Sequence, residues 1–153
     1  MTEQTPRSIA SIAGRPIHPM TVALPIALFV ATFSCDGLFY LLHDPILATA
    51  AYYALAAGIL LGVLAALFGF IDYYGSREIR NLKAANIHLI GNVFILVLSA
   101  FNLMLRYGAV NGLPLACFIL SAIVFVGIHV TGWMGWTMVY RHGVGVTAGK
   151  AGE

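Results

Sequence analysis

Residues 47–73 read LATAAYYALAAGILLGVLAALFGFIDY. This stretch carries no charged side chain before Asp72, and it exceeds the roughly 20 apolar residues that an α-helix needs to cross a bilayer. The composition of the whole chain agrees, because 60% of its 153 residues are hydrophobic and only 9% are charged. A soluble domain usually carries about a quarter charged residues. The sequence therefore predicts an integral membrane protein.

Three further segments are long and apolar, and short breaks with charged residues, proline or glycine separate all four. The expected spans are residues 20–42, 47–73, 85–105 and 113–139. Because the connections are short, we expect an all-α fold in which the helices form an antiparallel up-down four-helix bundle. Residues 14–146 make up this domain, and we expect flexible tails at 1–13 and 147–153.

The lysines and arginines indicate the orientation of the spans. Seven of the eight lie on one side of a four-span arrangement, and only Arg106 lies on the other. The seven are Arg7, Arg15, Arg77, Arg80, Lys83, Arg141 and Lys150. Loops rich in basic residues stay in the cytoplasm, so we expect a multi-pass protein of the bacterial inner membrane with both termini cytoplasmic. The scatter of these residues among short loops argues against a nucleic-acid partner.

Polar residues within the spans form two stripes. On the third span they are separated by 4, 7, 3 and 4 residues, which places them on one face of a helix. These residues are His88, Asn92, Ser99, Asn102 and Arg106. The first span has a similar stripe, formed by His18, Thr32, Asp36 and His43. Polar side chains in hydrocarbon usually face the bundle interior or mark a functional site.

The two stripes match in length. Eighteen residues separate His18 from Asp36, and eighteen separate His88 from Arg106. This spacing is five helical turns, about 27 Å, and both spans cross in the same direction. We therefore expect Asp36 to pair with Arg106 near the outer surface, as a structural clamp, and His18 to face His88 near the inner one.

Each span contributes one potential ligand side chain, histidine or aspartate, at its cytoplasmic end. These candidate cofactor or metal ligands are His18, Asp72, His88 and His142. Glycines on the second and fourth spans, among them Gly69 and Gly135, allow either close helix packing or room for a flat cofactor.

Several motifs resemble a large bacterial family of four-helix membrane proteins catalogued as a domain of unknown function. They are GRPIHPM at 14–20, PIALF at 25–29, GFIDY at 69–73, His88 with Asn92, residues 102–106, GWMG at 132–135 and YRHGVGV at 140–146. The resemblance covers about residues 14–146, and Met134, Thr137 and Met138 depart from the closing pattern. Family members are sometimes joined to Rieske-type or c-type cytochrome domains, so the resemblance implies electron transfer near them.

The leading functional hypothesis is a redox-associated membrane protein that holds b-type haem between His18 and His88, because two imidazoles are a normal axial pair. Asp72, Arg80 or Arg141 could hold the haem carboxylates or orient a ligand. Redox proteins, a second copy of the chain and the lipid bilayer are the expected partners.

Two alternatives stay open. The residues His18, Asp72, His88 and His142 could instead hold a zinc, copper or iron ion. The chain could also be a non-catalytic structural subunit of a larger membrane complex. Hydrolase or transferase activity has little support, since the sequence shows no nucleophile–base pair.

Overall fold

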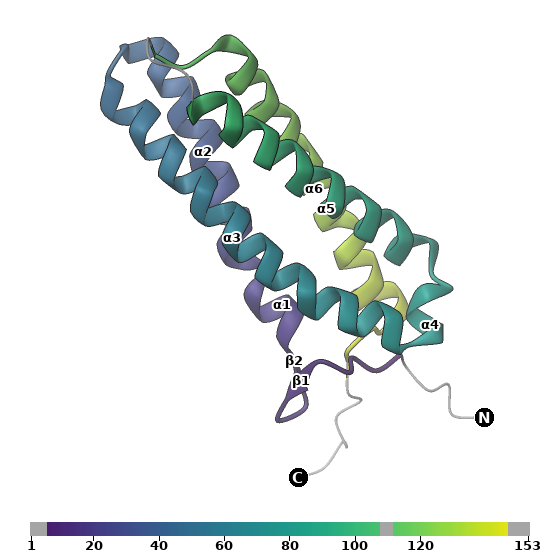
Figure 1. Ribbon diagram of the computed structural model, residues 1–153. Coiled ribbons are helices and arrows are strands. Elements are labelled where there is room, and N and C mark those ends of the chain that lie inside the picture. Colours follow the sequence, from purple (N-terminus) through teal and green to yellow (C-terminus); the bar gives the residue numbers. More distant parts are fainter. Residues whose placement is uncertain (1–5, 108–111, 147–153) are drawn as a thin grey trace, which may run out of the picture.

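The computed structural model describes residues 6–107 and 112–146 (Figure 1). Four long helices dominate this part of the chain, and the first of them is preceded by a short helix α1. The elements are α1 (Ile17–Thr21), α2 (Ala23–Leu42), α3 (Pro45–Gly75), α5 (Lys83–Tyr107) and α6 (Leu115–His142). Each of the four spans is long and apolar enough to cross a membrane. The predicted all-α bundle is confirmed. Helices α3 and α5 extend two residues past the expected spans at both ends, and α6 begins two residues later and ends three residues later than expected.

The break between α1 and α2 has a local cause. Pro25 has no backbone N–H, so the carbonyl of Thr21 cannot accept the bond that would continue the helix. The Thr21 hydroxyl turns back and donates to the carbonyl of His18, 3.0 Å away. His18 therefore lies on its own short helix at the entrance to the first span.

The tight connection between α2 and α3 defines the far end of the bundle. His43 ends α2 in the left-handed conformation, with a φ of 57°. Asp44 then caps α3 by accepting a hydrogen bond from the backbone N–H of Ile46 (3.0 Å), and Pro45 occupies the first turn. The opposite end holds α1, the short helix α4 (Arg77–Arg80) and the last turn of α6, and we call it the terminal end (Figure 1).

The four helices pack as two hairpins. Helix α2 lies along α3 and α5 lies along α6, while contacts of α3 with α5 and of α2 with α6 join the pairs (Figure 1). Helices α2 and α5, which carry the two polar stripes, are thus diagonal across the bundle. Large apolar side chains cover the outside, for example Leu60 (71% exposed) and Met104 (73% exposed), as in a helix bundle that lies within a bilayer.

A layer of buried apolar side chains fills the middle of the bundle, with members from all four long helices. The layer consists of Phe29, Leu55, Ile95, Val124 and Ile128. It lies between Asn92 and Ser99 of the α5 stripe, because Ile95 comes between them. The α5 stripe is therefore divided into His88 and Asn92 toward the terminal end and Ser99, Asn102 and Arg106 toward the far end.

The segment that enters the first span lies across the terminal end. A short hairpin of β1 (Ser11–Ile12) and β2 (Arg15–Pro16) is closed by Ala13 and Gly14, both with positive φ. Part of this segment belongs to the tail expected at 1–13, but from Pro6 onward it is held by hydrogen bonds to the bundle. The tail expected at 147–153 lies outside the described residues.

Candidate functional site

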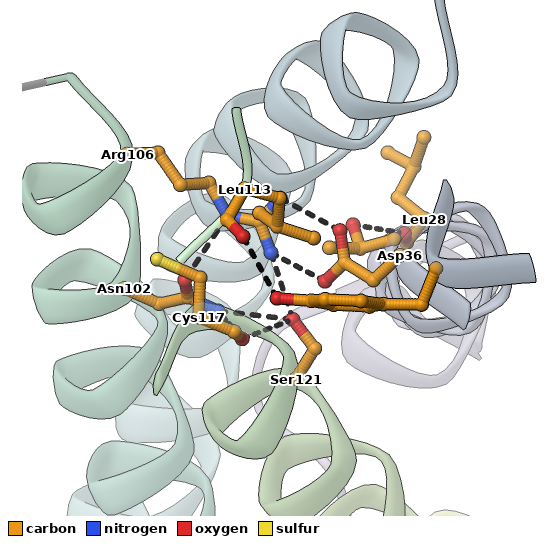
Figure 2. A network of polar contacts seen from close by, with 9 residues as sticks. Leu28, Asp36, Asn102, Arg106, Leu113, Cys117 and Ser121 are labelled. Carbon is orange, nitrogen blue, oxygen red and sulfur yellow. Dashed lines mark hydrogen bonds and ion pairs between the residues drawn. The ribbon is translucent and has the colours of Figure 1, made fainter. Parts of the chain in front are cut away.

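The polar group at the far end is built around Arg106, and Figure 2 shows its contacts. Its guanidinium donates to both carboxylate oxygens of Asp36, with a Nη1–Oδ1 distance of 2.8 Å, and both side chains are buried. Arg106 Nε donates to Asn102 Oδ1 (3.0 Å), and Nη2 donates to Ser121 Oγ (2.9 Å). The ion pair expected between the first and third spans is present.

Further hydrogen bonds tie this group to α6. The Asn102 amide donates to the carbonyl of Cys117 (3.1 Å) and to Ser121 Oγ (3.0 Å), and the Ser121 hydroxyl donates to the same carbonyl (3.0 Å). The charges of Asp36 and Arg106 compensate each other. The guanidinium of Arg106 makes further hydrogen bonds to the side chains of Asn102 and Ser121. Such a satisfied buried network joins α2, α5 and α6 as a clamp.

At the terminal end, His18 of α1 and His88 of α5 face each other. Their ring centroids are 6.0 Å apart, and the ring planes are nearly perpendicular, at 88°. The two imidazoles come from diagonal elements, and the matched eighteen-residue spacing places them together when Asp36 meets Arg106.

Backbone carbonyls fix both imidazoles in the same tautomer. His18 Nδ1 lies 2.8 Å from the carbonyl oxygen of Ala65, and His88 Nδ1 lies 2.8 Å from that of Thr131. A carbonyl only accepts hydrogen bonds, so each Nδ1 carries the proton and donates it. In the neutral imidazole each Nε2 then keeps its lone pair, which is the arrangement of a histidine that ligates a metal through Nε2.

Glycines let the imidazoles lie against the neighbouring helices. A Cβ atom on Gly69 of α3 would come within 3.1 Å of the His18 ring, and one on Gly135 of α6 within 3.2 Å of the His88 ring. Gly132 is different, because a Cβ atom there would meet no atom within 4 Å. It faces open space beside the histidine pair.

This space is a cavity of about 350 Å³ between the helices, within the usual size range of ligand sites. Its walls are mainly apolar and come from all four spans, for example Phe29, Gly62, Leu96 and Gly132, together with the two histidines. Partly exposed side chains such as Ile26 of α2 also line it. The cavity therefore reaches the lipid-facing surface of the bundle.

Asp72 lines the same cavity as His18 and His88, and its carboxylate is hydrogen-bonded to the N-terminal segment. Its carboxylate accepts hydrogen bonds from the Ser8 hydroxyl (2.8 Å) and from the backbone N–H groups of Ile9 (2.7 Å) and Ala10 (2.8 Å). The carbonyl of Ala10 in turn accepts from the backbone N–H of Ile17, the residue before His18. Asp72 thus fixes the N-terminal segment that leads into α1.

The remaining candidates lie apart from the histidine pair. His142 is exposed at the last position of α6, and Arg80 is turned toward the carbonyl of Tyr74, to which its Nη1 donates (3.0 Å). Arg141 is also exposed. Among the residues that the structure describes, no group of three or more His, Cys, Asp or Glu side chains is placed to hold a metal ion.

Two residues support His88 from its own helix and from α6. The Asn92 amide donates to the carbonyl of His88 (2.7 Å), and the Thr131 hydroxyl donates to Asn92 Oδ1 (3.3 Å). The α5 stripe points to Asn92, but nothing in the sequence marks Thr131, because its main contribution is a backbone carbonyl.

The fold and these internal polar groups define a class of four-span membrane protein, in which the described residues outside the helices form short connections and one N-terminal hairpin. The chain belongs to the family described as "Predicted membrane protein (DUF2231)", whose family model matches residues 14–148. The resemblance to a four-helix family of unknown function is thereby confirmed. No curated protein and no solved structure matches the chain.

Proposed function

We propose that this protein is a small membrane cytochrome that binds b-type haem between His18 and His88 and exchanges electrons through it. The observation that carries the proposal is the facing pair of imidazoles, each with Nδ1 donating to a carbonyl and Nε2 available. Two imidazoles are a common axial pair of electron-transfer haems.

The spacing of the rings supports this ligand set. Two iron–nitrogen bonds of about 2 Å and the roughly 1 Å from each nitrogen to its ring centre add up to about 6 Å. The centroids of His18 and His88 are 6.0 Å apart. His18 and His88 would hold the iron through their Nε2 atoms, and the distance between their ring centroids is compatible with this role.

The cavity supports a flat ligand at this position. His18 and His88 come from one diagonal pair of elements, and residues of the other pair, α3 and α6, also line the cavity. Gly132 of α6 is one of them, and a haem would find open space beside it. Haem also supplies four ring nitrogens of its own, so two protein ligands complete its coordination, whereas a zinc ion takes about four ligands.

A haemin titration of the purified chain in detergent tests the proposal. We expect a stoichiometric complex with the Soret band of a six-coordinate, low-spin haem. His18→Ala and His88→Ala should each abolish this spectrum, and His43→Ala, which removes an imidazole at the far end, should leave it unchanged. Gly132→Leu should weaken haem binding, because Gly132 lines the cavity and a Cβ atom there meets no atom within 4 Å, so the larger side chain has room to occupy part of it.

The outcomes separate the alternatives. A colourless protein that binds zinc, copper or iron ions through His18 and His88 would replace the haem proposal by a metal-ion site. A protein that binds neither haem nor metal would support the role of a structural subunit. A red protein whose spectrum survives both histidine substitutions would contradict the assignment of the ligands.

A further inference from the structure

His129 lies near the middle of α6 and is exposed on the outer surface of the bundle, where the span meets lipid. Its ring packs against Phe125 with 4.6 Å between centroids and an angle of 55° between the ring planes, and Phe125 stacks on Phe33 of α2 at the same centroid distance. The imidazole therefore lies beside the seam between α2 and α6. A polar side chain at this depth is costly unless a partner satisfies it, and such residues usually mark function.

The hydrogen bond within α6 fixes what that partner must offer. His129 Nδ1 lies 2.7 Å from the carbonyl oxygen of Phe125, so Nδ1 carries the proton and donates it. The neutral imidazole then presents Nε2 as a hydrogen-bond acceptor. A ligand for this position needs a hydroxyl or N–H donor and must reach the site through the bilayer.

The surroundings of His129 suit an aromatic ligand. A shallow outer groove is lined by Phe125, Val126, His129, Val130, Trp133 and Met134. Gly132 and Trp136, on the same face of α6, line the cavity beside the histidine pair, and Gly132 is only about 4.5 Å further along the helix axis. The groove thus adjoins the place where the cavity reaches the bilayer.

We propose that this groove binds a lipid-soluble quinol, with a hydroxyl of the quinol donating to His129 Nε2 and its ring lying against Trp133. The choice of a quinol rests on the proposed function, because a haem in the adjoining cavity needs a redox partner that approaches within the membrane. The acceptor character of Nε2 selects the quinol over the quinone, which has carbonyl oxygens and no hydroxyl donor.

The two tryptophans of the chain, Trp133 and Trp136, report on the groove directly. The full chain in lipid nanodiscs is titrated with a short-tailed benzoquinol and with the matching benzoquinone, and tryptophan emission is recorded. We expect saturable quenching with tighter binding of the quinol. His129→Phe keeps the aromatic contact with Phe125 but lacks the acceptor, so quinol affinity should fall roughly tenfold, the effect of one hydrogen bond.

Two controls sharpen the result. His129→Gln restores an acceptor and should recover part of the quinol preference, and His43→Asn, far from the groove, should bind like the unaltered chain. If quenching rises linearly with quinol concentration and equally in all variants, the proposed site is contradicted. A change in oligomeric state in His129→Phe with unchanged quinol affinity would overturn it in favour of a contact between copies.

The same titration in His18→Ala separates the two proposals. That variant lacks the proposed axial ligand, so its groove should still bind quinol while its haem spectrum is lost. Saturable quinol binding by a chain that never binds haem would refute the cytochrome proposal alone. A haem-loaded chain without saturable quinol binding would refute the groove alone.

Discussion

At the scale of single residues, Asp36 and Arg106 illustrate why a buried charge is rarely found alone in a membrane. Each is almost completely buried, and each depends on the other for charge compensation. The cost of taking both from water is recovered only while the pair and its hydrogen bonds are complete. The network therefore contributes to stability mainly through the penalty for breaking it.

This pairing predicts non-additive effects of substitution. Asp36→Asn and Arg106→Gln should each lower the free energy of unfolding by about 3–5 kcal/mol, because each leaves one buried charge without its partner. The double variant should lose less free energy of unfolding than the sum of the two single losses. Thermal unfolding in detergent measures this, with Arg141→Gln, an exposed arginine, as the control. Additive losses would show that the two residues do not interact.

Residues that act through a polar side chain could be predicted from their type and spacing in the sequence. Residues that act through a backbone carbonyl could not. The spacing of His18, Asp36, His88 and Arg106 follows from helix geometry, so both facing pairs were predictable. The carbonyl partners of the histidines were not, because every residue has a carbonyl and only the packing of α3 and α6 decides which one is near.

At the scale of elements, the N-terminal segment is a part of the fold rather than an appendage to it. Three donors of residues 8–10 converge on Asp72 of α3, and Gly145, beyond α6, donates its N–H to the carbonyl of Pro6 (2.9 Å). The depth of Asp72 and the helix face that it shares with Gly69 predicted its place beside the histidines, and all three side chains line one cavity. The backbone N–H groups of Ile9 and Ala10 compete for its carboxylate, and a sequence pattern does not show them.

Asp72→Asn should release this segment. Hydrogen bonds to a charged acceptor contribute about 1.5–3 kcal/mol each, and the amide is a weaker acceptor for the three donors. We expect faster hydrogen exchange at the N–H groups of Ile9 and Ala10, measured by mass spectrometry. Asp44→Asn, which alters a cap at the far end, is the control and should leave these sites unchanged. Unchanged exchange in Asp72→Asn would contradict the anchoring role.

Haem binding in the same variant tests the other role considered for Asp72. Because its carboxylate is bound to the N-terminal segment, Asp72→Asn should keep a low-spin haem spectrum. At most, haem affinity should fall, because the segment that leads into His18 is held less firmly. Loss of an axial-ligand signature would instead assign Asp72 to the coordination of the iron.

At the scale of the whole molecule, the distribution of basic residues predicts the orientation in the membrane. The terminal end carries α4 and the start and end of the described chain, and Arg106 belongs to the far end. Fusion of a fluorescent protein to the C-terminus should give a fluorescent product, and fusion of alkaline phosphatase there should be inactive. Active phosphatase at the C-terminus would reverse the orientation, and with it the side on which His18 and His88 lie.

The apolar layer of Phe29, Leu55, Ile95, Val124 and Ile128 has a consequence for the passage of ions through the bundle. Proton conduction needs an unbroken chain of water or polar side chains, and the layer interrupts the polar stripe of α5 between Asn92 and Ser99. We therefore expect the bundle to act as an insulator in the membrane, without conducting protons from one end to the other.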